Sequence, residues 1–298
     1  MAGLPMDQRD GWIWFDGELK PWKDAKVHVL THGLHYASSV FEGERAYGGE
    51  IFKSREHTER LIRSAATLDM KPFPYSVDEI EAAKQLVLEK NNLVDAYVRP
   101  VVWRGSEELS VPARKNKIHV AIAAWVWPSY FSVEEKLKGI RLEWSKWKRP
   151  SPETIPSSAK AAGLYMICTL SKDAAMANGY ADALMLDYRG YVAEATGANV
   201  FFIKGKEITT PTPDCILNGI TRQTLIALAH ENGYTVTERH IMPEELSQFD
   251  ECFLTGTAAE VTPVSEIGEY KFTPGDACRT LIDAYAQAVQ PKKAAAAE

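Results

Sequence analysis

The chain has 298 residues, of which 45% are hydrophobic and 25% charged, so it is long enough for two domains with separate buried cores. The formal net charge of -6 argues against a nucleic-acid-binding protein, because such a protein presents surplus Lys and Arg to phosphate. No stretch approaches the roughly 20 apolar residues of a membrane span, and the first residues do not form a secretory signal. We therefore expect a cytoplasmic protein with no membrane partner.

The cysteines do not predict a metal site. Four of them are widely spaced, without a CxxC pair or a neighbouring His pair at the spacing of metal ligands. We expect four buried, reduced thiols. They are Cys168, Cys215, Cys252 and Cys278.

The first half alternates strand-like and helix-like segments. We expect residues 12–15 and 26–30 to be paired strands, with a turn at Asp16-Gly17 after the first of them. Ser54 can cap a helix that runs toward Leu68, and Ser76-Val-Asp-Glu79 is a capping box before a second helix. Two β-branched and aromatic segments read as buried strands of one sheet. They are residues 97–102 and 119–126.

A polar, Lys-rich stretch follows Trp127-Pro128 and predicts the domain boundary. We expect a smaller N-terminal α/β domain at residues 1–131, a connecting loop at 132–139 and a larger C-terminal domain at 140–298. In the second half we expect strands, helices and an irregular segment at 150–156, with a frayed Ala- and Lys-rich tail. The expected strands are 140–147, 181–187, 191–203 and 252–254, and the expected helices are 162–178, 221–232 and 277–289.

Lys160 is the first candidate for chemistry. It lies in Ile155-Pro-Ser-Ser-Ala-Lys160-Ala-Ala-Gly163, among small and apolar neighbours. Burial there would favour the neutral amine, which is the form that condenses with a carbonyl to give a Schiff base. The residues alone do not exclude the alternative that Lys160 is an exposed lysine in a loop.

Two segments have the character of anion sites. Thr255-Gly-Thr-Ala-Ala-Glu260 follows an expected strand, and its small residues let backbone N–H groups approach a ligand. Gly219-Ile-Thr-Arg222 begins an expected helix, whose first N–H groups can receive a phosphate. Considered alone, either segment is more simply explained by turn and cap chemistry. Because the chain has no Walker motif and no GxGxxG, two such segments point to a phosphate that does not belong to ATP.

Three charged side chains stand in unusual places. Glu194 interrupts an otherwise buried strand, so its carboxylate must reach solvent or face a cation. Arg99 lies in an apolar strand, where a guanidinium needs an anion, either an internal carboxylate or a ligand. The helix position of Arg60 suggests a solvated face when the sequence is considered alone.

Taken together, these motifs resemble the signature segments of the class IV, fold-type IV pyridoxal-phosphate aminotransferases, and in particular the branched-chain amino acid aminotransferases. The resemblance covers nearly the whole chain. It rests on Thr154-Ile-Pro-Ser-Ser-Ala-Lys160, Glu194-Ala-Thr-Gly-Ala-Asn199, Gly219-Ile-Thr-Arg222, Thr255-Gly-Thr-Ala-Ala-Glu260, Ser39-Val-Phe-Glu-Gly43 and Tyr97-Val-Arg-Pro100.

This resemblance implies a two-domain α/β fold, with a barrel-like mixed sheet in the larger domain and pyridoxal 5'-phosphate bound as a Schiff base on Lys160. Lys160 would also carry a proton between the substrate and the coenzyme. Glu194 would pair with the pyridine nitrogen and Tyr165 with the phenolic oxygen. The phosphate ligands implied are Arg60, Ile220, Thr221 and Thr257.

The same resemblance implies transfer of an amino group from leucine, isoleucine or valine to 2-oxoglutarate. Tyr97 and the Thr257-Ala258 backbone would hold the α-carboxylate, and Arg99 the distal carboxylate of glutamate. The enzyme would be a homodimer or a hexamer built as a trimer of dimers, with Tyr36 supplied by a second subunit to an active site at the interface. The remaining implied substrate residues are Phe41, Gly43, Arg45, Trp127, Tyr130 and Tyr165.

Two features depart from the family pattern. Ala198 stands where relatives often carry a second acidic residue, which affects the support of Glu194. The loop Gly105-Ser-Glu-Glu-Leu-Ser-Val111 carries two acidic residues where many relatives are apolar, which affects the substrate range.

Other functions remain open on this basis. D-amino acid and (R)-amine aminotransferases share the fold and the lysine, and an aminodeoxychorismate-lyase-like protein is a second alternative. A third is a phosphate-sugar binding module without a coenzyme.

Overall fold

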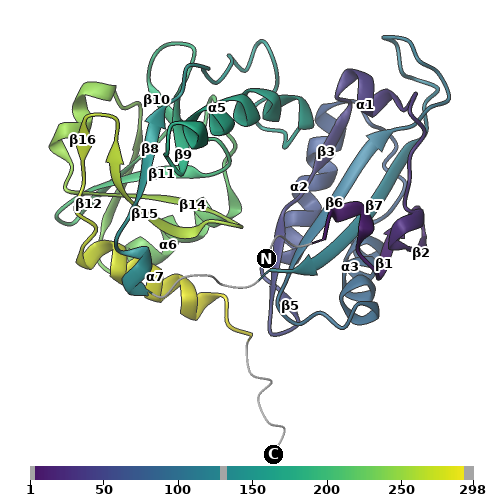
Figure 1. Cartoon of the computed structure of the whole chain (residues 1–298), viewed down its shortest axis with the longest axis horizontal. Helices are drawn as coiled ribbons and strands as arrows, with labels where there is room; N and C mark the ends of the chain where they lie inside the picture. Colours follow the sequence, from purple (N-terminus) through teal and green to yellow (C-terminus); the bar gives the residue numbers. More distant parts are fainter. Residues whose placement is uncertain (1–3, 128–132, 292–298) are drawn as a thin grey trace, which may run out of the picture. The chain divides into compact units, whose positions relative to one another are not determined.

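The computed structural model describes residues 4–127 and 133–291, which form two compact units (Figure 1). Among the described residues, the first unit comprises 4–127, 159–163 and 290–291. The second unit comprises 133–158 and 164–289. The short segment around Lys160 therefore packs in the first unit, although it follows the expected domain boundary in the sequence.

The described part of the first unit is built on a seven-stranded antiparallel sheet. Its order is β2-β1-β7-β6-β4-β5, and β3 pairs with one end of β6 beside β4. The long strands β6 and β7 confirm the two buried strands expected from their β-branched and aromatic residues. The strands are β1 (Trp12–Phe15), β2 (Glu18–Pro21), β3 (Ser39–Phe41), β4 (Glu44–Tyr47), β5 (Glu50–Ile51), β6 (Ala96–Arg104) and β7 (Ile118–Val126).

Two amphipathic helices pack on this sheet, α2 (Ser54–Thr67) against β3 and β6, and α3 (Val77–Lys90) against β1 and β7. The expected capping box is present, because Ser76 accepts the N–H of Glu79 and the Glu79 carboxylate accepts the N–H of Ser76. The shorter helices are η1 (Met6–Gln8), η2 (Trp22–Asp24) and α1 (His32–Tyr36).

Buried charges join the sheet to α3. The side chains of Glu44 and Lys84 are both fully buried, and Lys84 Nζ lies 2.7 Å from the Glu44 carboxylate. Lys84 Nζ also lies 2.7 Å from Glu81 and donates to the Ser54 carbonyl at 3.0 Å. Each N–H of this ammonium group therefore has an acceptor, which is the condition for burying it.

Six strands of the second unit close into a barrel in the order β10-β9-β8-β15-β14-β11, because β11 pairs again with β10. The β8–β9 and β8–β15 pairs are parallel, and the other four are antiparallel. Apolar side chains such as Leu184, Phe202 and Val264 fill its core. The strands are β8 (Ile140–Trp144), β9 (Asp182–Leu186), β10 (Val192–Ala195), β11 (Asn199–Lys204), β14 (Glu251–Gly256) and β15 (Glu260–Ile267).

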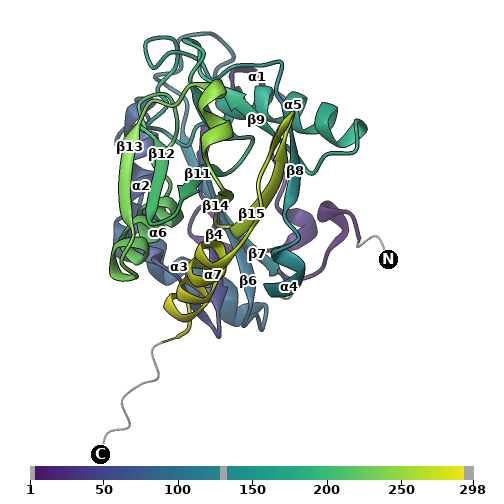
Figure 2. The same cartoon turned by 90° about the vertical axis from the view of Figure 1, so that its left-hand side faces the viewer.

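Three further strands extend the barrel, and helices cover it. β12 (Glu207–Pro211) pairs with β11 and in parallel with β13 (Thr235–Arg239), while β16 (Tyr270–Lys271) pairs with β15. Figure 2 shows α6 and α7 near β14, against which both helices pack. The helices in this half of the chain are α4 (Val133–Lys136), α5 (Met166–Ala177), α6 (Ile220–Glu231), η4 (Pro243–Gln248), α7 (Asp276–Ala288) and η3 (Ala162–Tyr165), which begins in the 159–163 segment of the first unit.

Two local expectations were wrong. Residues 26–30 form no strand, and β1 pairs instead with β2, directly after the Asp16-Gly17 turn. The apolar side chains of that segment do not mark a buried strand, since Val27 and Val29 are more than half exposed. Ser54 is the first residue of α2 and not its cap; Lys53, in the left-handed conformation, occupies the cap position without a side-chain bond.

Two other expectations concern segments of which the structure describes only a part or nothing. The connecting loop expected at 132–139 contains the one-turn helix α4, and residue 132 lies outside the described residues, as does the tail after residue 291. Within the described ranges, none of the helices combines the length and apolar character needed to cross a membrane.

Because the Glu44–Lys84 pair is buried, we predict that removing its cation strongly destabilises the fold. We expect Lys84→Met to lower the free energy of unfolding by about 3–5 kcal/mol, because the buried Glu44 carboxylate then lacks its cation. Urea unfolding followed by circular dichroism measures the change. Lys115→Met, which removes an exposed partner of Glu108, is the control and should leave the unfolding curve nearly unchanged. Equal shifts in the two variants would contradict the assignment.

Candidate active site

The backbone of Lys160 is held by two elements of the first unit. The Phe41 N–H donates to the Lys160 carbonyl at 3.2 Å, and the Lys160 N–H donates to Ser64 Oγ of α2 at 3.1 Å. Next to them, Val40 and Ala161 form an isolated antiparallel bridge. Lys160 is partly buried, and its Nζ lies 4.9 Å from the centroid of the Phe41 ring. The main chain is thus fixed, while the amine extends over an aromatic face.

The same aromatic ring lies beside Arg99. The Arg99 guanidinium is 4.7 Å from the Phe41 ring centroid and 5.2 Å from that of Tyr97, and its Nη2 donates to Tyr97 Oη at 3.0 Å. Within the described residues Arg99 has no carboxylate partner, so the internal ion pair considered from the sequence is absent there. Phe41, Tyr97, Arg99 and Lys160 therefore form one cluster, in which two cations border aromatic rings.

Gly43 makes room for Tyr97. A Cβ atom on Gly43 would lie 2.1 Å from Tyr97 Oη and 3.0 Å from its Cζ. Tyr97 also packs against Trp125 and Trp127, with ring centroids 5.1 and 5.2 Å apart. The absence of a side chain at position 43 thus sets where the Tyr97 hydroxyl lies.

Arg60 is buried, so the solvated helix face expected from the sequence was wrong. Its Nε and Nη2 donate to the two oxygens of Glu42, each at 2.7 Å, and His57 Nδ1 lies 2.7 Å from Glu42 Oε2. Glu42 is itself fully buried.

Glu194 of β10 is buried in the second unit. Arg149 Nε lies 3.2 Å from Glu194 Oε1, and Asn199 Nδ2 donates to Glu194 Oε2 at 3.1 Å. Of the two explanations left open by the sequence, the cationic partner is the one observed. An adjacent guanidinium favours the ionised carboxylate, which is the form able to accept a hydrogen bond from a protonated ring nitrogen.

Asn199 connects Glu194 to the start of α6. Its Nδ2 also donates to the Leu217 carbonyl at 3.0 Å, and a Cβ on Gly219 would lie 2.4 Å from Asn199 Oδ1. Gly219 occupies the cap position of α6, so the cap residue itself provides no side-chain acceptor for the first N–H groups of that helix. A helix terminus without a side-chain cap has N–H groups with which an anion can pair. Ile220 and Thr221 are its first two residues.

The Thr257-Ala258 segment lies beside this group. Thr257 begins the turn between β14 and β15, and the Asn199–Thr255 pair places β14 next to β11. A Cβ on Gly256 would lie 3.3 Å from the Gly197 carbonyl, so glycine allows the turn to approach the Gly197-Ala198 backbone.

The remaining predicted residues lie elsewhere or outside the description. Tyr36 ends α1, is 47% exposed and packs on His32, with no described contact to the Lys160 cluster. Arg45 is buried, and its Nη2 donates to the Trp127 carbonyl at 3.4 Å. Tyr165 ends η3 at the start of α5 and is partly buried. Tyr130 lies outside the described residues.

Both departures from the family pattern have local explanations. Ala198 is buried in the barrel core, and Arg149 and Asn199 support the Glu194 carboxylate. In the 105–111 loop, Glu107 accepts the Lys117 N–H at 3.0 Å and Glu108 pairs with Lys115 at 2.7 Å. The two acidic residues thus hold the loop to the segment that follows it.

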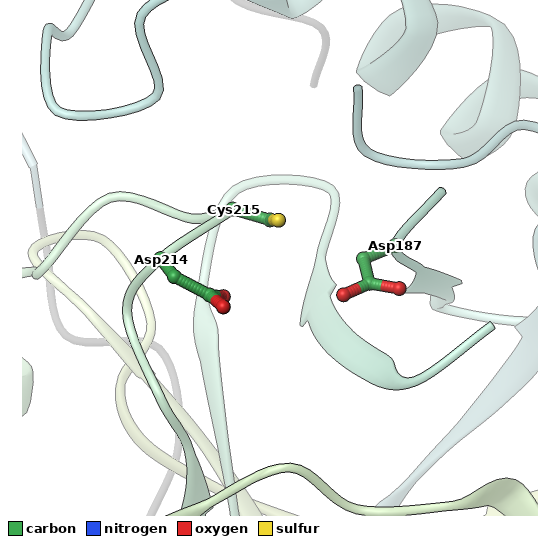
Figure 3. A group of neighbouring side chains, drawn as sticks. All are labelled: Asp187, Asp214 and Cys215. Carbon is green, nitrogen blue, oxygen red and sulfur yellow. The ribbon is translucent and has the colours of Figure 1, made fainter. Parts of the chain in front are cut away.

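Figure 3 shows a second group of chemically capable side chains, Asp187, Asp214 and Cys215. Arg189 Nη2 lies 2.6 Å from the Asp187 carboxylate and 2.8 Å from that of Asp214, so a guanidinium already neutralises both. Burial raises the pKa of Cys215 to about 11, which keeps it a thiol at neutral pH, whereas a metal needs the thiolate. We assign this cluster a structural role. The four cysteines are free and buried, as expected.

Three residues that support the site were not predicted from the sequence. Glu42, Ser64 and Arg149 each contact a predicted site residue, namely Arg60, Lys160 and Glu194. Glu42 alone had a local signal, because a carboxylate between buried strands requires a cation.

Comparison with known proteins identifies the family. Residues 39–267 match the model of the amino-transferase class IV family. A probable branched-chain-amino-acid aminotransferase of Rickettsia felis is 46% identical over 93% of this chain and 94% of its own length. The branched-chain-amino-acid aminotransferase of Pseudomonas aeruginosa is 45% identical over 91% and 90%.

Solved structures agree with the sequence relatives. The T.th. branched-chain amino acid aminotransferase with pyridoxamine 5'-phosphate is 39% identical, with a TM-score of 0.91 over 95% of both chains. The same enzyme complexed with N-(5'-phosphopyridoxyl)-L-glutamate gives a TM-score of 0.89 at 38% identity over 94% of both chains. The chain belongs to the class IV aminotransferases. It is an enzyme with the fold-type IV architecture, and its coenzyme is pyridoxal 5'-phosphate.

The Gly43–Tyr97 contact predicts a catalytic defect. We expect Gly43→Ala to lower kcat/KM by about ten- to a hundredfold, because the new methyl group displaces the Tyr97 hydroxyl from Arg99. In a Tyr97→Phe background the same substitution should cost less, since the atom that it displaces is already gone. Steady-state kinetics of the four proteins test this, and strictly multiplicative losses would argue against the steric explanation.

Proposed function

We propose that this chain catalyses the reversible transfer of the amino group of leucine, isoleucine or valine to 2-oxoglutarate, giving branched-chain 2-oxo acids and L-glutamate. The observation that carries the proposal is Arg99, a cation with no carboxylate partner among the described residues, set against aromatic rings beside Lys160. An apolar wall with one guanidinium accepts a hydrocarbon side chain and also pairs with a distal carboxylate. The names of the relatives and the glutamate adduct of the T.th. enzyme support this substrate pair.

The residues present suit the coenzyme. Pyridoxal phosphate, when bound, supplies an aldehyde that condenses with amines and a protonated ring that withdraws electrons. Lys160 Nζ is the proposed amine that anchors it. Glu194, which lies beside Arg149, would accept the ring N–H, and Tyr165 would donate to the phenolic oxygen.

Each residue proposed to bind the phosphate has a feature that suits an anion. The N–H groups of Ile220 and Thr221 at the start of α6 suit an anion, because no side chain caps them. Thr257 adds a donor from the turn after β14, and Arg60 adds the positive charge.

The remaining proposed roles are proton transfer at the substrate and binding of the substrate. Lys160 Nζ would take the proton from the substrate α-carbon and return one to the coenzyme, serving as general base and then as general acid. Tyr97 and the Thr257-Ala258 backbone hold the α-carboxylate. The proposed side-chain pocket uses Tyr36 of a second subunit together with Phe41, Gly43, Arg45, Trp127, Tyr130 and Tyr165.

The proposal extends to the oligomeric state and the cellular location of the enzyme. We infer a homodimer, or a hexamer of three dimers, with the active site at the subunit interface. The exposed Tyr36 and the exposed apolar residues near it, Val29 and Leu34, are compatible with a subunit contact. We also infer a cytoplasmic enzyme, as expected from the sequence.

A substrate panel tests the activity. Purified protein given leucine and 2-oxoglutarate should produce glutamate, whereas D-alanine or an (R)-amine as donor should give little. We expect Lys160→Ala to lose transamination with every donor, because both the anchor and the proton carrier are removed. Glutamate formation by that variant at the wild-type rate would refute the role of Lys160. Pyruvate release from a chorismate-derived amine, without glutamate, would favour the lyase alternative.

The proposed role of Arg99 predicts unequal effects of its removal on the two half-reactions. We expect Arg99→Ala to lower kcat/KM for glutamate and 2-oxoglutarate by about 10- to 100-fold, the value of a charge-assisted hydrogen bond, with a smaller loss for leucine. Single-turnover absorbance changes measure each half-reaction separately. Arg104→Ala is a matched control on the same strand, since Arg104 binds the Leu68 and Asp69 carbonyls at the end of α2. Equal losses for leucine and glutamate in Arg99→Ala would contradict the assignment.

A further inference from the structure

Glu42 lies between β3 and β4, where its carboxylate is fully buried. The Glu42 N–H donates to the Pro100 carbonyl at 2.9 Å, which ties this residue to β6. Both carboxylate oxygens are used, because Arg60 Nε donates to Oε1 and Arg60 Nη2 to Oε2, and His57 Nδ1 contacts Oε2. The short connection between β3 and β4 thus presents a fixed carboxylate to α2.

The bonds between Glu42 and Arg60 set the orientation of the guanidinium. A planar guanidinium held through Nε and Nη2 has no freedom to rotate, so the direction of Nη1 is determined as well. Burial raises the pKa of Glu42, but the charges and hydrogen bonds of Arg60 and His57 lower it further, and the net shift is strongly downward. Glu42 is therefore an anion at neutral pH.

Glu44 provides an internal comparison. It is two residues away and equally buried, yet its cation is Lys84 of α3, and burial raises its pKa despite that partner. Both carboxylates bind the sheet to a helix. Only Glu42 contacts a side chain that the proposed function assigns to the phosphate.

We propose that Glu42 is a positioning residue for phosphate binding, acting through Arg60. The inference rests on the proposed function, in which Arg60 binds the coenzyme phosphate. Glu42 itself touches neither substrate nor coenzyme. It holds the guanidinium in one orientation, and His57 holds the carboxylate, so the phosphate meets a cation that needs no rearrangement.

The experiment compares a ligand that carries the phosphate with one that lacks it. Full-length protein freed of coenzyme is titrated with pyridoxal phosphate and with pyridoxal, and binding is followed by absorbance. Glu42→Gln should weaken pyridoxal phosphate binding by about tenfold, a typical cost of losing a residue that orients a ligand-binding group, and leave pyridoxal binding unchanged. Glu44→Gln, the matched control, removes an equally buried charge and should leave the ratio of the two affinities at the wild-type value.

Other variants separate this inference from the function on which it rests. Arg60→Ala should lower the same ratio at least as far; an unchanged ratio there would remove the phosphate role of Arg60 itself. A normal ratio in Glu42→Gln together with a reduced ratio in Arg60→Ala would overturn only the role of Glu42. Should Glu42→Gln fail to fold, Glu42→Asp decides, since it keeps the charge but shortens the reach. We expect a smaller loss confined to pyridoxal phosphate, and wild-type affinity in that variant would overturn the proposal.

Discussion

The two hydrogen bonds that hold the Lys160 main chain are the interaction on which the site depends. One comes from the strand β3, the other goes to Ser64 of α2, and neither uses the lysine side chain. Because these two bonds use only the main chain of Lys160, a covalent bond at its amine can form and break without disturbing them. The same strand carries Phe41 and leads directly into Glu42 and Gly43, so one short segment places the amine, the aromatic wall and the support of Arg60.

Compensation of buried charge is the second organising constraint. A carboxylate in a protein interior is stable only beside a cation and with its oxygens hydrogen-bonded. Glu42, Glu44 and Glu194 each lie beside such a cation, Arg60, Lys84 and Arg149 respectively, although Glu44 Oε1 has no hydrogen-bond partner among the described residues. The cost of burying these ions is offset by their pairing, and the result is a set of charges with defined directions. Such preorganised charges act on a bound ligand more effectively than mobile ones in water do.

Local sequence rules predicted the elements whose determinants lie within them. The capping box at Ser76 and Glu79 fixed the start of α3, and the β-branched runs of β6 and β7 located the centre of the first sheet. The same rules failed for residues 26–30, because an apolar run does not reveal whether a partner strand is available. Here the adjacent Glu18–Pro21 segment pairs with β1 instead.

Pairings between distant residues could not be predicted in this way. Nothing near Glu194 in the sequence indicates that Arg149 will be its partner, and nothing near Lys160 indicates Ser64. The family resemblance supplied roles for Lys160, Glu194 and Arg60, whereas the residues that orient them emerged only from the folded chain. Supporting residues act through tertiary contacts, so their positions are a property of the fold and not of a local motif.

Chemical trapping of the coenzyme tests the central claim most directly. Borohydride reduction of the yellow protein makes the bond between amine and coenzyme permanent, and proteolysis followed by mass spectrometry locates it. The account predicts a phosphopyridoxyl group on the peptide that contains Lys160, at that residue. An unmodified Lys160, or a label on a different lysine, would contradict it.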